Sequence, residues 1–329
     1  MPRKIRALGL LSGGLDSTLA GALLRAQGIE VTFICFTTPF FGPQRASEAA
    51  AHLGLPLKIV DFTEKFEPLL YEPPHGFGKG HNPCIDCHIL MIREAGAMMP
   101  AEGGDFVFTG EVLGQRPMSQ NRGSLNLVAQ ESGLGDLLLR PLSAKLLKTS
   151  RPELEGWVDR ERLLNLSGRG RKRQIALAAE YGITQYPAPA GGCLLTDPGY
   201  ALRIKELLQH QARASRRDLE LLKWGRHFRL PRGAKAVVGR TQGENEAISG
   251  LKAPGDYGLK VENFPGPLVL VIGAVLELDL QEAAGLAAAY SDAPTGAAVQ
   301  VGVEDNGKVR LLQLVAPRKV RYKDLLMQL

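Results

Sequence analysis

The sequence predicts an α/β protein, with a doubly wound parallel sheet followed by a smaller α+β domain. Short apolar runs alternate with helical patterns in the order β-α-β-α-β, which is typical of parallel strands joined by crossover helices. The first of these runs ends in a glycine turn that leads directly into a helix. From about residue 231, short strands alternate with Gly/Pro turns. We therefore expect domains over residues 1–200 and 231–329, joined by a basic helical linker over residues 201–230.

Composition and charge restrict the classes of protein to which the chain can belong. Hydrophobic residues make up 44% of the 329 residues, and no apolar run approaches the roughly 20 residues of a membrane-spanning helix. The start, Met1-Pro2-Arg3-Lys4, leads straight into a strand and does not resemble a signal peptide. We expect a cytoplasmic protein without a membrane segment. The net charge of +6 and the pI near 9.1 indicate a polyanionic partner.

The turn after the first strand has the composition of an anion site. An apolar strand over residues 5–11 precedes a helix in which Leu15, Leu19 and Leu23 recur at helical spacing. Glycines allow backbone N–H groups to approach a phosphate, serines add hydroxyl donors, and the helix N-terminus attracts negative charge. The residues expected to hold phosphates are Ser12, Gly13, Gly14, Asp16 and Ser17. The Gly-Lys-Ser/Thr ending of a Walker loop is absent, and a glycine turn without a ligand is the alternative.

The segment Ser12-Gly13-Gly14-Leu15-Asp16-Ser17 resembles the pyrophosphate loop of the PP-loop ATPases. Members of that family split ATP into AMP and pyrophosphate and adenylate an acyl or carbonyl oxygen. The resemblance implies an adenine nucleotide alpha hydrolase-like fold, ATP as a cofactor, and a Mg²⁺ ion oriented by Asp16.

The next elements extend the predicted sheet. A second strand over residues 30–36 is expected to run parallel to the first, so that Phe36 or Thr37 at its end forms a wall for adenine. Cys35 in the same run is expected to be a core residue. A helix over residues 44–53 and a third strand over residues 57–61 complete the β-α-β-α-β order.

Cysteines are few, and most lie outside predicted strands; they are Cys35, Cys84, Cys87 and Cys193. In a cytosolic enzyme such sparse use favours metal binding or catalysis over disulfides. Residues 71–82 are rich in Gly, Pro and His and predict a loop, so Cys84 and Cys87 stand at a loop-to-helix junction. A helix terminus there is expected to lower the thiol pKa values. Gly191 and Gly192 allow the backbone near Cys193 to approach closely.

Two later strands, over residues 105–110 and 137–142, end in polar motifs. The motifs are Thr109-Gly110-Glu111-Val112-Leu113-Gly114-Gln115, Ser119-Gln120 and Leu139-Arg140-Pro141-Leu142. With the cysteine pair and the Met91 and Arg93 that follow it, they resemble the catalytic domain of the tRNA 4-thiouridine synthetases over about residues 4–200. The tRNA 2-thiouridylases share the loop and a comparable cysteine pair, but their strand-end motifs match less well. Two departures are the absence of the usual N-terminal RNA-binding extension and of a rhodanese-like pattern.

The resemblance implies roles at both reaction centres. Thr109 and Gly110 are expected to line the nucleotide site, and Lys145 or Lys148 to stabilise the developing phosphate charge unless both are exposed helix lysines. Cluster-bearing members of the family hold a [4Fe-4S] cluster with three cysteines, and one open iron binds a hydrosulfide that attacks the adenylated base. The residues to which this role falls are Cys84, Cys87 and Cys193.

Two alternatives exist for these cysteines. Cys84 or Cys87 can carry a persulfide that Cys193 resolves as a disulfide. The three thiolates can instead bind a structural zinc together with His81 or His88.

The basic residues and the C-terminal part point to RNA. Arg169, Arg171, Lys172 and Arg173 form one cluster, and the linker continues the series against few acids. Such a run is often a solvated face, but beside a nucleotide site it indicates RNA. Strands are expected over residues 236–241, 257–261, 266–271, 299–303 and 309–315, with a helix over residues 280–290. This part resembles the small RNA-binding domain of the NFACT proteins, which act in ribosome quality control; a plain oligomerisation or lid domain is the alternative.

Together these patterns predict an ATP-dependent tRNA sulfurtransferase that adenylates a uridine carbonyl, O4 by the closer resemblance, and replaces its oxygen with sulfur. The implied partners are tRNA and a sulfur donor, either inorganic sulfide or a cysteine desulfurase relay, and the resemblance admits a homodimer. The alternatives are a persulfide-based enzyme of the 2-thiouridylase type, an enzyme that thiolates a metabolite, and a non-catalytic RNA-binding factor with a vestigial nucleotide loop.

Overall fold

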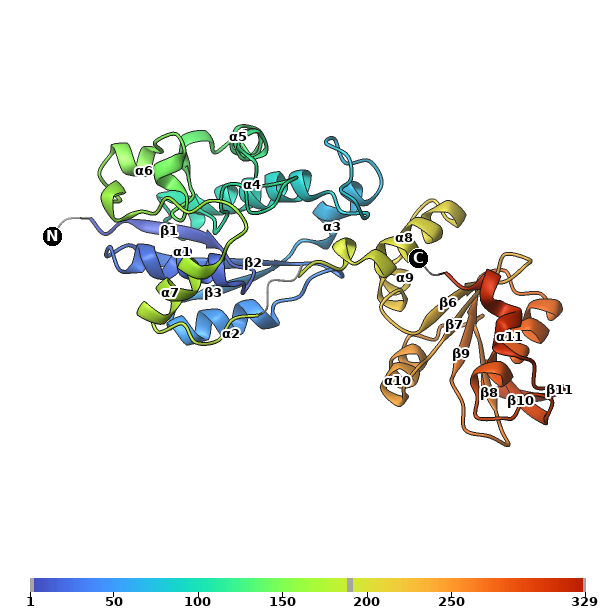
Figure 1. Ribbon diagram of the computed structural model, residues 1–329. Coiled ribbons are helices and arrows are strands. Elements are labelled where there is room, and N and C mark those ends of the chain that lie inside the picture. The colour runs from blue at the N-terminus through green and yellow to red at the C-terminus, as the bar shows by residue number, and fades with distance from the viewer. Residues whose placement is uncertain (1–2, 188–191, 328–329) are drawn as a thin grey trace. The chain divides into compact units, whose positions relative to one another are not determined.

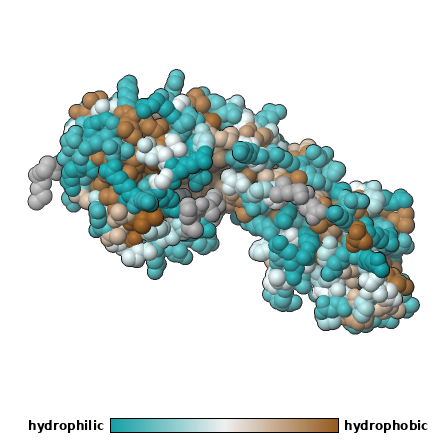
Figure 2. Space-filling model, in the orientation of Figure 1, coloured by the Kyte–Doolittle hydropathy of each residue, from teal (hydrophilic) through white to brown (hydrophobic). Residues whose placement is uncertain are grey.

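The computed structural model describes residues 3–187 and 192–327, which form two compact units, Met1–Asp197 and Pro198–Leu329 (Figure 1). Gly191, one of the glycines predicted to free the backbone near Cys193, lies outside the described residues. Within the described ranges, no helix combines the length and the apolar character needed to cross a membrane. Figure 2 shows hydrophilic side chains over most of the visible face of both units, with apolar ones in small groups.

The first unit contains a parallel sheet of five strands in the order β3-β2-β1-β4-β5, which confirms the predicted doubly wound α/β fold. The strands are β1 (Arg6–Leu10), β2 (Glu30–Thr37), β3 (Leu57–Asp61), β4 (Phe106–Phe108) and β5 (Leu138–Leu139). β1 is central, since Leu8 lies between Thr32 of β2 and Val107 of β4. Because the strands are parallel, the loops after β1, β2, β4 and β5 gather at one edge of the sheet.

Helices cover both faces of this sheet (Figure 1). The longer ones are α1 (Leu15–Arg25), α2 (Gln44–Leu53) and α7 (Lys172–Glu180) on one face and α4 (Cys84–Glu102) and α5 (Arg122–Glu131) on the other, with short helices at α3 (Thr63–Phe66) and α6 (Arg151–Leu154). Packing is close around two aromatic rings. A Cβ at Gly21 of α1 would lie 2.2 Å from the ring of Phe33, and one at Gly9 of β1 would lie 2.2 Å from the ring of Phe108. Glycine at these positions lets the rings fill the space between sheet and helix.

The sequence predicts some elements of the first unit less well. The strand predicted over residues 137–142 pairs with β4 only at Leu138 and Leu139. Pro141 has no backbone N–H to donate, and the chain turns there, with Ser143 N donating to Arg140 O at 3.0 Å. α4 begins at Cys84, so both cysteines of the pair belong to the helix itself.

The second unit begins with two helices, α8 (Pro198–His210) and α9 (Arg216–Leu221), and continues with an antiparallel sheet of six strands in the order β11-β10-β8-β9-β7-β6. The strands are β6 (Arg226–Arg229), β7 (Lys235–Val238), β8 (Tyr257–Val261), β9 (Val269–Ile272), β10 (Ala298–Asp305) and β11 (Lys308–Val315). α11 (Glu277–Tyr290) packs on one face and α10 (Gln242–Gly250) on the other. This is the expected smaller α+β architecture.

The predicted helical linker over residues 201–230 differs from the structure at its end. The chain is helical there only up to Leu221, and β6 belongs to the sheet of the second unit. His227 and Phe228 are buried where β6 pairs with β7, so burial in the sheet outweighs the polar composition of the segment.

The two outer strands of the second sheet differ in whether other residues cover their outer edge. Phe228 of β6 pairs with Leu326, and Met327 N donates to His227 O at 2.9 Å, so residues 326–327 cover that edge. Tyr322, just before them, is 1% exposed against α11. Along the outer side of β11 no strand pairs within the described part of the chain, and its Val309, Leu311 and Val315 are each more than half exposed.

Candidate functional site

The predicted phosphate loop connects β1 to α1 at the edge where the parallel strands end. Gly13 has a φ of +73°, and a Cβ on it would lie 2.3 Å from the backbone of Arg45, so no other residue fits. The hydroxyls of Ser12 and Ser17 are 3.3 Å apart, and Gly14 N donates to Ser12 Oγ at 3.3 Å. Ser17 Oγ also donates to Gly14 O at 3.0 Å. The loop is therefore held in a fixed turn at a helix N-terminus, a geometry that suits phosphate.

Asp16, in the first turn of α1, has one carboxylate oxygen that accepts no hydrogen bond from the described residues. Gln115 Nε2 donates to Oδ2 at 3.0 Å. Oδ1 is buried and has no hydrogen-bond partner within the described ranges. Burial raises the pKa of Asp16, although the side chains of Gln115 and Gln174 and the guanidinium groups of Arg171 and Arg116 favour the charged form. A buried carboxylate oxygen without a donor fits a hard cation such as Mg²⁺.

The end of β4 lies directly against this loop. A Cβ at Gly110 would lie 2.4 Å from Ser17 N, so the backbones of the two segments are in contact. Thr109 precedes this contact and turns its hydroxyl to Glu111 at 3.0 Å. Phe36, at the end of β2, is 5% exposed with its ring centroid 4.8 Å from that of Phe62, which leaves only a small edge of the ring for a nucleotide base.

A buried carboxylate with no role predicted from the sequence connects β4, β5 and α4. Glu111 Oε1 accepts from His88 Nδ1 at 2.7 Å, and its Oε2 accepts from Arg140 Nε at 2.8 Å and from Thr109 Oγ1 at 3.0 Å. Burial opposes the charge on Glu111, but Arg140 and His88 outweigh it and hold the pKa of this carboxyl well below its usual range. His88 follows Cys87 in α4, so this network fixes the cysteine-bearing turn against the sheet edge.

Cys193 is brought to the same place by backbone hydrogen bonds. Its segment is anchored on one side by Leu194 N, which donates to Phe40 O at 3.0 Å, and on the other by Leu195 O, which accepts from His81 N at 3.3 Å. The three thiols of Cys84, Cys87 and Cys193 lie close enough to act on one another electrostatically. The structure thus brings together the three cysteines predicted to act as a set, and it leaves Cys35 apart in the core.

The thiol pKa values differ from the sequence prediction. Burial raises the pKa of Cys87 well above its ordinary value, and the neighbouring Cys193 and Cys84 add to this effect. Burial also raises the pKa of Cys193 to about 12. The lowering expected from a helix terminus is therefore wrong for Cys87, because desolvation and repulsion between three neighbouring thiols outweigh the helix. Without a cation beside them, Cys87 and Cys193 keep their protons at neutral pH.

The three thiols suit an iron–sulfur cluster chemically, whereas a single metal ion has no site among the described residues. Across residues 3–187 and 192–327, no three His, Cys, Asp or Glu side chains are arranged to hold a metal ion. The histidines considered for zinc are engaged elsewhere, since His88 binds Glu111 and His81 Nε2 lies 2.8 Å from Leu70 O. Asn82 Nδ2 donates to Cys84 Sγ at 3.1 Å.

Asp86, between the two cysteines, ties the preceding loop to α4. His75 Nδ1 donates to Asp86 Oδ1 at 2.7 Å, and His75 N donates to Oδ2 at 3.1 Å. The hydrogen bond to Asp86 raises the pKa of His75. The loop over residues 71–83 is thereby held on the first turn of the helix.

Basic residues act electrostatically on the phosphate loop, and one of them also acts on a thiol. The guanidinium of Arg116 favours the charged forms of both Asp16 and Cys193, so it lies within electrostatic range of both. Arg171, from the predicted basic cluster, acts on Asp16 in the same way. Lys148 is exposed after β5, whereas Lys145 donates to the Glu161 carbonyl oxygen at 2.8 Å and to its carboxylate at 2.9 Å.

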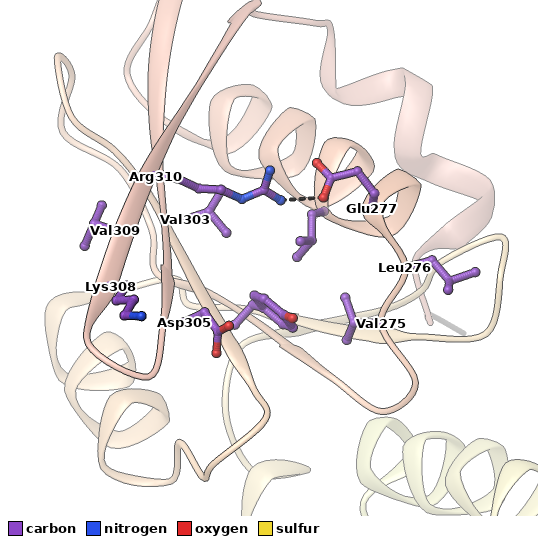
Figure 3. Close-up of a pocket in the computed structure, with 10 residues that line it drawn as sticks. Val275, Leu276, Glu277, Val303, Asp305, Lys308, Val309 and Arg310 are labelled. Atoms are coloured by element: carbon purple, nitrogen blue, oxygen red, sulfur yellow. Dashed lines mark hydrogen bonds and ion pairs between the residues drawn. The ribbon is translucent and has the colours of Figure 1, made fainter.

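The second unit contains an open pocket of about 420 Å³ between β10, β11 and the start of α11 (Figure 3). Arg310 of β11 points toward Glu277 of α11, and its Nη2 donates to that carboxylate at 2.6 Å. Tyr257 and Leu280 also line the pocket. The pocket therefore combines an aromatic ring and apolar side chains with an ion pair at a surface strand.

Two family profiles match the chain, one in each unit. Residues 4–146 match the family described as thiamine biosynthesis protein (ThiI), and residues 225–320 match the family described as NFACT protein RNA binding domain. The second match starts within the predicted linker and covers β6 to β11.

Relatives with sequence similarity are tRNA-modifying proteins. A tRNA-specific 2-thiouridylase MnmA of Syntrophotalea carbinolica is 35% identical over 118 residues, which cover 30% of this chain and 32% of the relative. A probable tRNA sulfurtransferase of Anoxybacillus flavithermus is 27% identical over 158 residues, covering 45% of this chain and 37% of the relative. The chain thus spans about a third of the length of these curated relatives.

Two solved structures match the chain with TM-scores below 0.5. A predicted subunit of tRNA methyltransferase from Methanocaldococcus jannaschii is 17% identical with a TM-score of 0.37, covering 64% of this chain and 89% of the other. A 4-thiouridine synthetase, solved with RNA and bound ATP, is 18% identical with a TM-score of 0.32, covering 54% and 51%.

Proposed function

We propose, from the premise that the chain combines a ThiI-type PP-loop domain with an NFACT-type RNA-binding domain, that it is an ATP-dependent tRNA sulfurtransferase. The observation that carries this proposal is the connection between the phosphate loop and the thiols. Ser17 touches Gly110, Glu111 follows Gly110 and binds His88, and His88 is adjacent to Cys87. A nucleotide site and a sulfur site therefore share one edge of one sheet.

The phosphate loop performs the activation half of the reaction. The backbone and hydroxyls of residues 12–17 bind the phosphates of ATP, and Arg116 and Arg171 offset their charge. The uridine carbonyl oxygen, O4 in our proposal, attacks the α-phosphorus, and pyrophosphate leaves. When bound at Asp16 Oδ1, Mg²⁺ would neutralise charge on the phosphates and orient them for this displacement.

The three thiols perform the sulfur half. A sulfur nucleophile held at Cys84, Cys87 and Cys193 attacks the carbon of the adenylated carbonyl, the C–S bond forms, and AMP leaves with the original oxygen. Arg116, in range of both Asp16 and Cys193, stabilises the negative charge that passes between the two centres. The sulfur donor in this proposal is inorganic sulfide or a cysteine desulfurase relay.

Iron content separates two forms of the sulfur site. In the proposed [4Fe-4S] form, about four irons and four sulfides per chain accompany an absorbance band near 400 nm that Cys84→Ala removes. In the persulfide form, the active protein holds no iron, and a cysteine desulfurase relay supplies the outer sulfur of a persulfide on Cys84 or Cys87. That outer sulfur forms the C–S bond as AMP leaves, Cys193 attacks the inner sulfur to form a disulfide, and an external thiol reduces the disulfide. Anaerobic purification with iron and sulfide analysis distinguishes the two.

The second unit is proposed to bind tRNA through its basic residues, as the name of its matching family suggests. Binding to phosphates by Lys and Arg weakens steeply with salt. We further propose that the enzyme acts in the cytoplasm, where its substrate tRNA is found, and that a homodimer is its assembled form.

The decisive experiment measures pyrophosphate release and thiouridine formation with tRNA, ATP and sulfide under anaerobic conditions. Cys193→Ala should release pyrophosphate, because adenylation does not use the thiols, but form no thiouridine, while the core variant Cys35→Ala should do both. Thiouridine formation by Cys193→Ala would contradict the sulfur-transfer role. A wild-type protein that binds tRNA but releases no pyrophosphate would instead be a non-catalytic RNA-binding factor.

A further inference from the structure

A second pocket in the second unit, of about 400 Å³, has no role in the reaction proposed above. It lies between the helices α8 and α9 and the hairpin formed by β6 and β7. The hairpin turn is tight, with Leu230 N donating to Ala234 O at 2.8 Å and Gly233 at a φ of +101°. This turn directs Arg229, Arg232 and Lys235 toward one cavity.

Cations outnumber available anions around this cavity. Glu206 contacts three basic side chains: its Oε1 accepts from Arg229 Nε at 2.6 Å and lies 3.2 Å from His210 Nε2, and its Oε2 lies 3.7 Å from Lys235 Nζ. That last separation is longer than a hydrogen bond, and Glu206 Oε2 has no hydrogen-bond partner in the described ranges. One carboxylate cannot neutralise both Arg229 and Lys235.

The two acids that line the cavity are already bound by other groups. Asp218 accepts from Ser215 N at 2.9 Å, from Ser215 Oγ at 2.7 Å and from Gln211 Nε2 at 3.0 Å. Asp256 is paired with Arg217 and accepts from Ala253 N at 2.7 Å. Asp256 is therefore neutralised by Arg217, whereas Asp218 still acts on Lys235 electrostatically.

Lys235 is the least expected of these residues, because it is 3% exposed. A fully buried lysine is rare unless it is paired. Its ammonium group makes no hydrogen bond to any described residue, and its one ion pair, with Glu206, is long. Burial lowers the pKa of Lys235 to about 8; Arg229 and Arg203 add to this effect, and Glu206 and Asp218 oppose it. Arg232 stands in the exposed hairpin turn and forms no ion pair within residues 3–187 and 192–327. The cavity thus presents a buried lysine with one long ion pair and an exposed arginine with none among the described residues.

We propose that this pocket binds the phosphate of a phosphate monoester, with Lys235 and Arg232 as its main ligands. Arginine supplies paired N–H donors in one plane, and lysine supplies a compact positive charge; the two often bind phosphate together. Because Lys235 is buried, only a terminal phosphate can reach it. A phosphodiester within a nucleic-acid chain carries a nucleoside on each side, so it is not expected to enter the cavity. A volume of about 400 Å³ also accommodates the sugar and base of a nucleotide.

The test uses the full-length protein and titration calorimetry. Inorganic phosphate and uridine 5′-monophosphate should bind, and uridine should not. Lys235→Met and Arg232→Gln should each weaken phosphate binding by about tenfold or more, the loss of a hydrogen bond to a charged group. Lys260→Met, which removes the same charge from the exposed part of β8, is the matched control and should bind as the wild type does.

A pair of RNA oligonucleotides identifies the source of the phosphate. Tighter binding of a 5′-phosphorylated oligonucleotide than of its 5′-hydroxyl form and of the mononucleotide assigns the pocket to RNA ends. Equal binding of mononucleotide and phosphorylated RNA assigns it to small phosphorylated ligands. Arg232→Gln changes an exposed turn and decides the question even if Lys235→Met does not fold. Absence of phosphate binding, or binding unchanged in Arg232→Gln, would overturn the proposal, and neither result depends on sulfur transfer.

Discussion

Removing the carboxylate of Glu111 should destabilise the first unit strongly. Glu111 is 4% exposed and accepts hydrogen bonds of 2.7, 2.8 and 3.0 Å, and Arg140 beside it is 7% exposed. Glu111→Ala leaves that guanidinium buried without its counter-charge, a change that typically costs about 3–5 kcal/mol of unfolding free energy. Glu111→Gln keeps the shape but loses the charge, so its effect should be smaller and still above about 1 kcal/mol.

The assay is urea denaturation of the wild type, Glu111→Ala, Glu111→Gln, Arg140→Met and the double variant Glu111→Gln/Arg140→Met. If the two charges are directly coupled, the double variant should be less destabilised than the sum of the single changes, by about 1–3 kcal/mol. Glu30→Gln, in an exposed ion pair with Arg6, is the control and should leave the denaturation midpoint close to that of the wild type. Additive single effects would refute a shared network, and an unchanged midpoint in Glu111→Ala would refute burial of the pair.

Two further predictions concern the loop and the helix that carries the cysteines. Gly110→Ala places a Cβ 2.4 Å from Ser17 N, and the backbone atoms there cannot move aside. ATP binding should therefore weaken at least tenfold, and the unfolding free energy should fall by about 1–3 kcal/mol. Gly243→Ala, whose Cβ would have no atom within 4 Å, is the control for both measurements. His75 has its pKa raised by Asp86, so its stabilisation is present below the pKa of the unfolded state and is lost as pH rises through the folded-state pKa. His75→Gln should therefore lower the melting temperature most at about pH 6 and least at about pH 9, and a difference that grows with pH would contradict the assigned pair.

The parts of the fold that depend on local pattern could be predicted from the sequence. The helix over residues 44–53 and the strand over residues 57–61 have the predicted bounds, because each combines a clear apolar period with a turn at its end. The α10 helix and the start of β6 were not evident. α10 buries only Ile248, and β6 carries arginines at both ends, so their place in the fold depends on the partner strands and faces rather than on their own composition.

The site shows the same division between local and tertiary information. The glycine turn at residues 12–17 predicts an anion site by itself, since its backbone geometry is determined by neighbouring residues. The role of Glu111 depends on His88 and Arg140, which are far from it in sequence, and no short motif indicates that all three meet. The raised thiol pKa of Cys87 likewise follows from burial beside Cys193, which only the folded chain creates.

The way in which residues 326–327 cover the edge of β6 has a consequence for folding during synthesis. Phe228 and Leu326 are far apart in sequence, so β6 emerges from the ribosome long before the segment that completes its edge. Until Tyr322 and the residues after it are available, β6 exposes unpaired backbone groups next to a partly formed core. The second unit therefore depends on a late, long-range closure step, and a nascent chain that stalls before it offers an open strand to chaperones or to neighbouring chains.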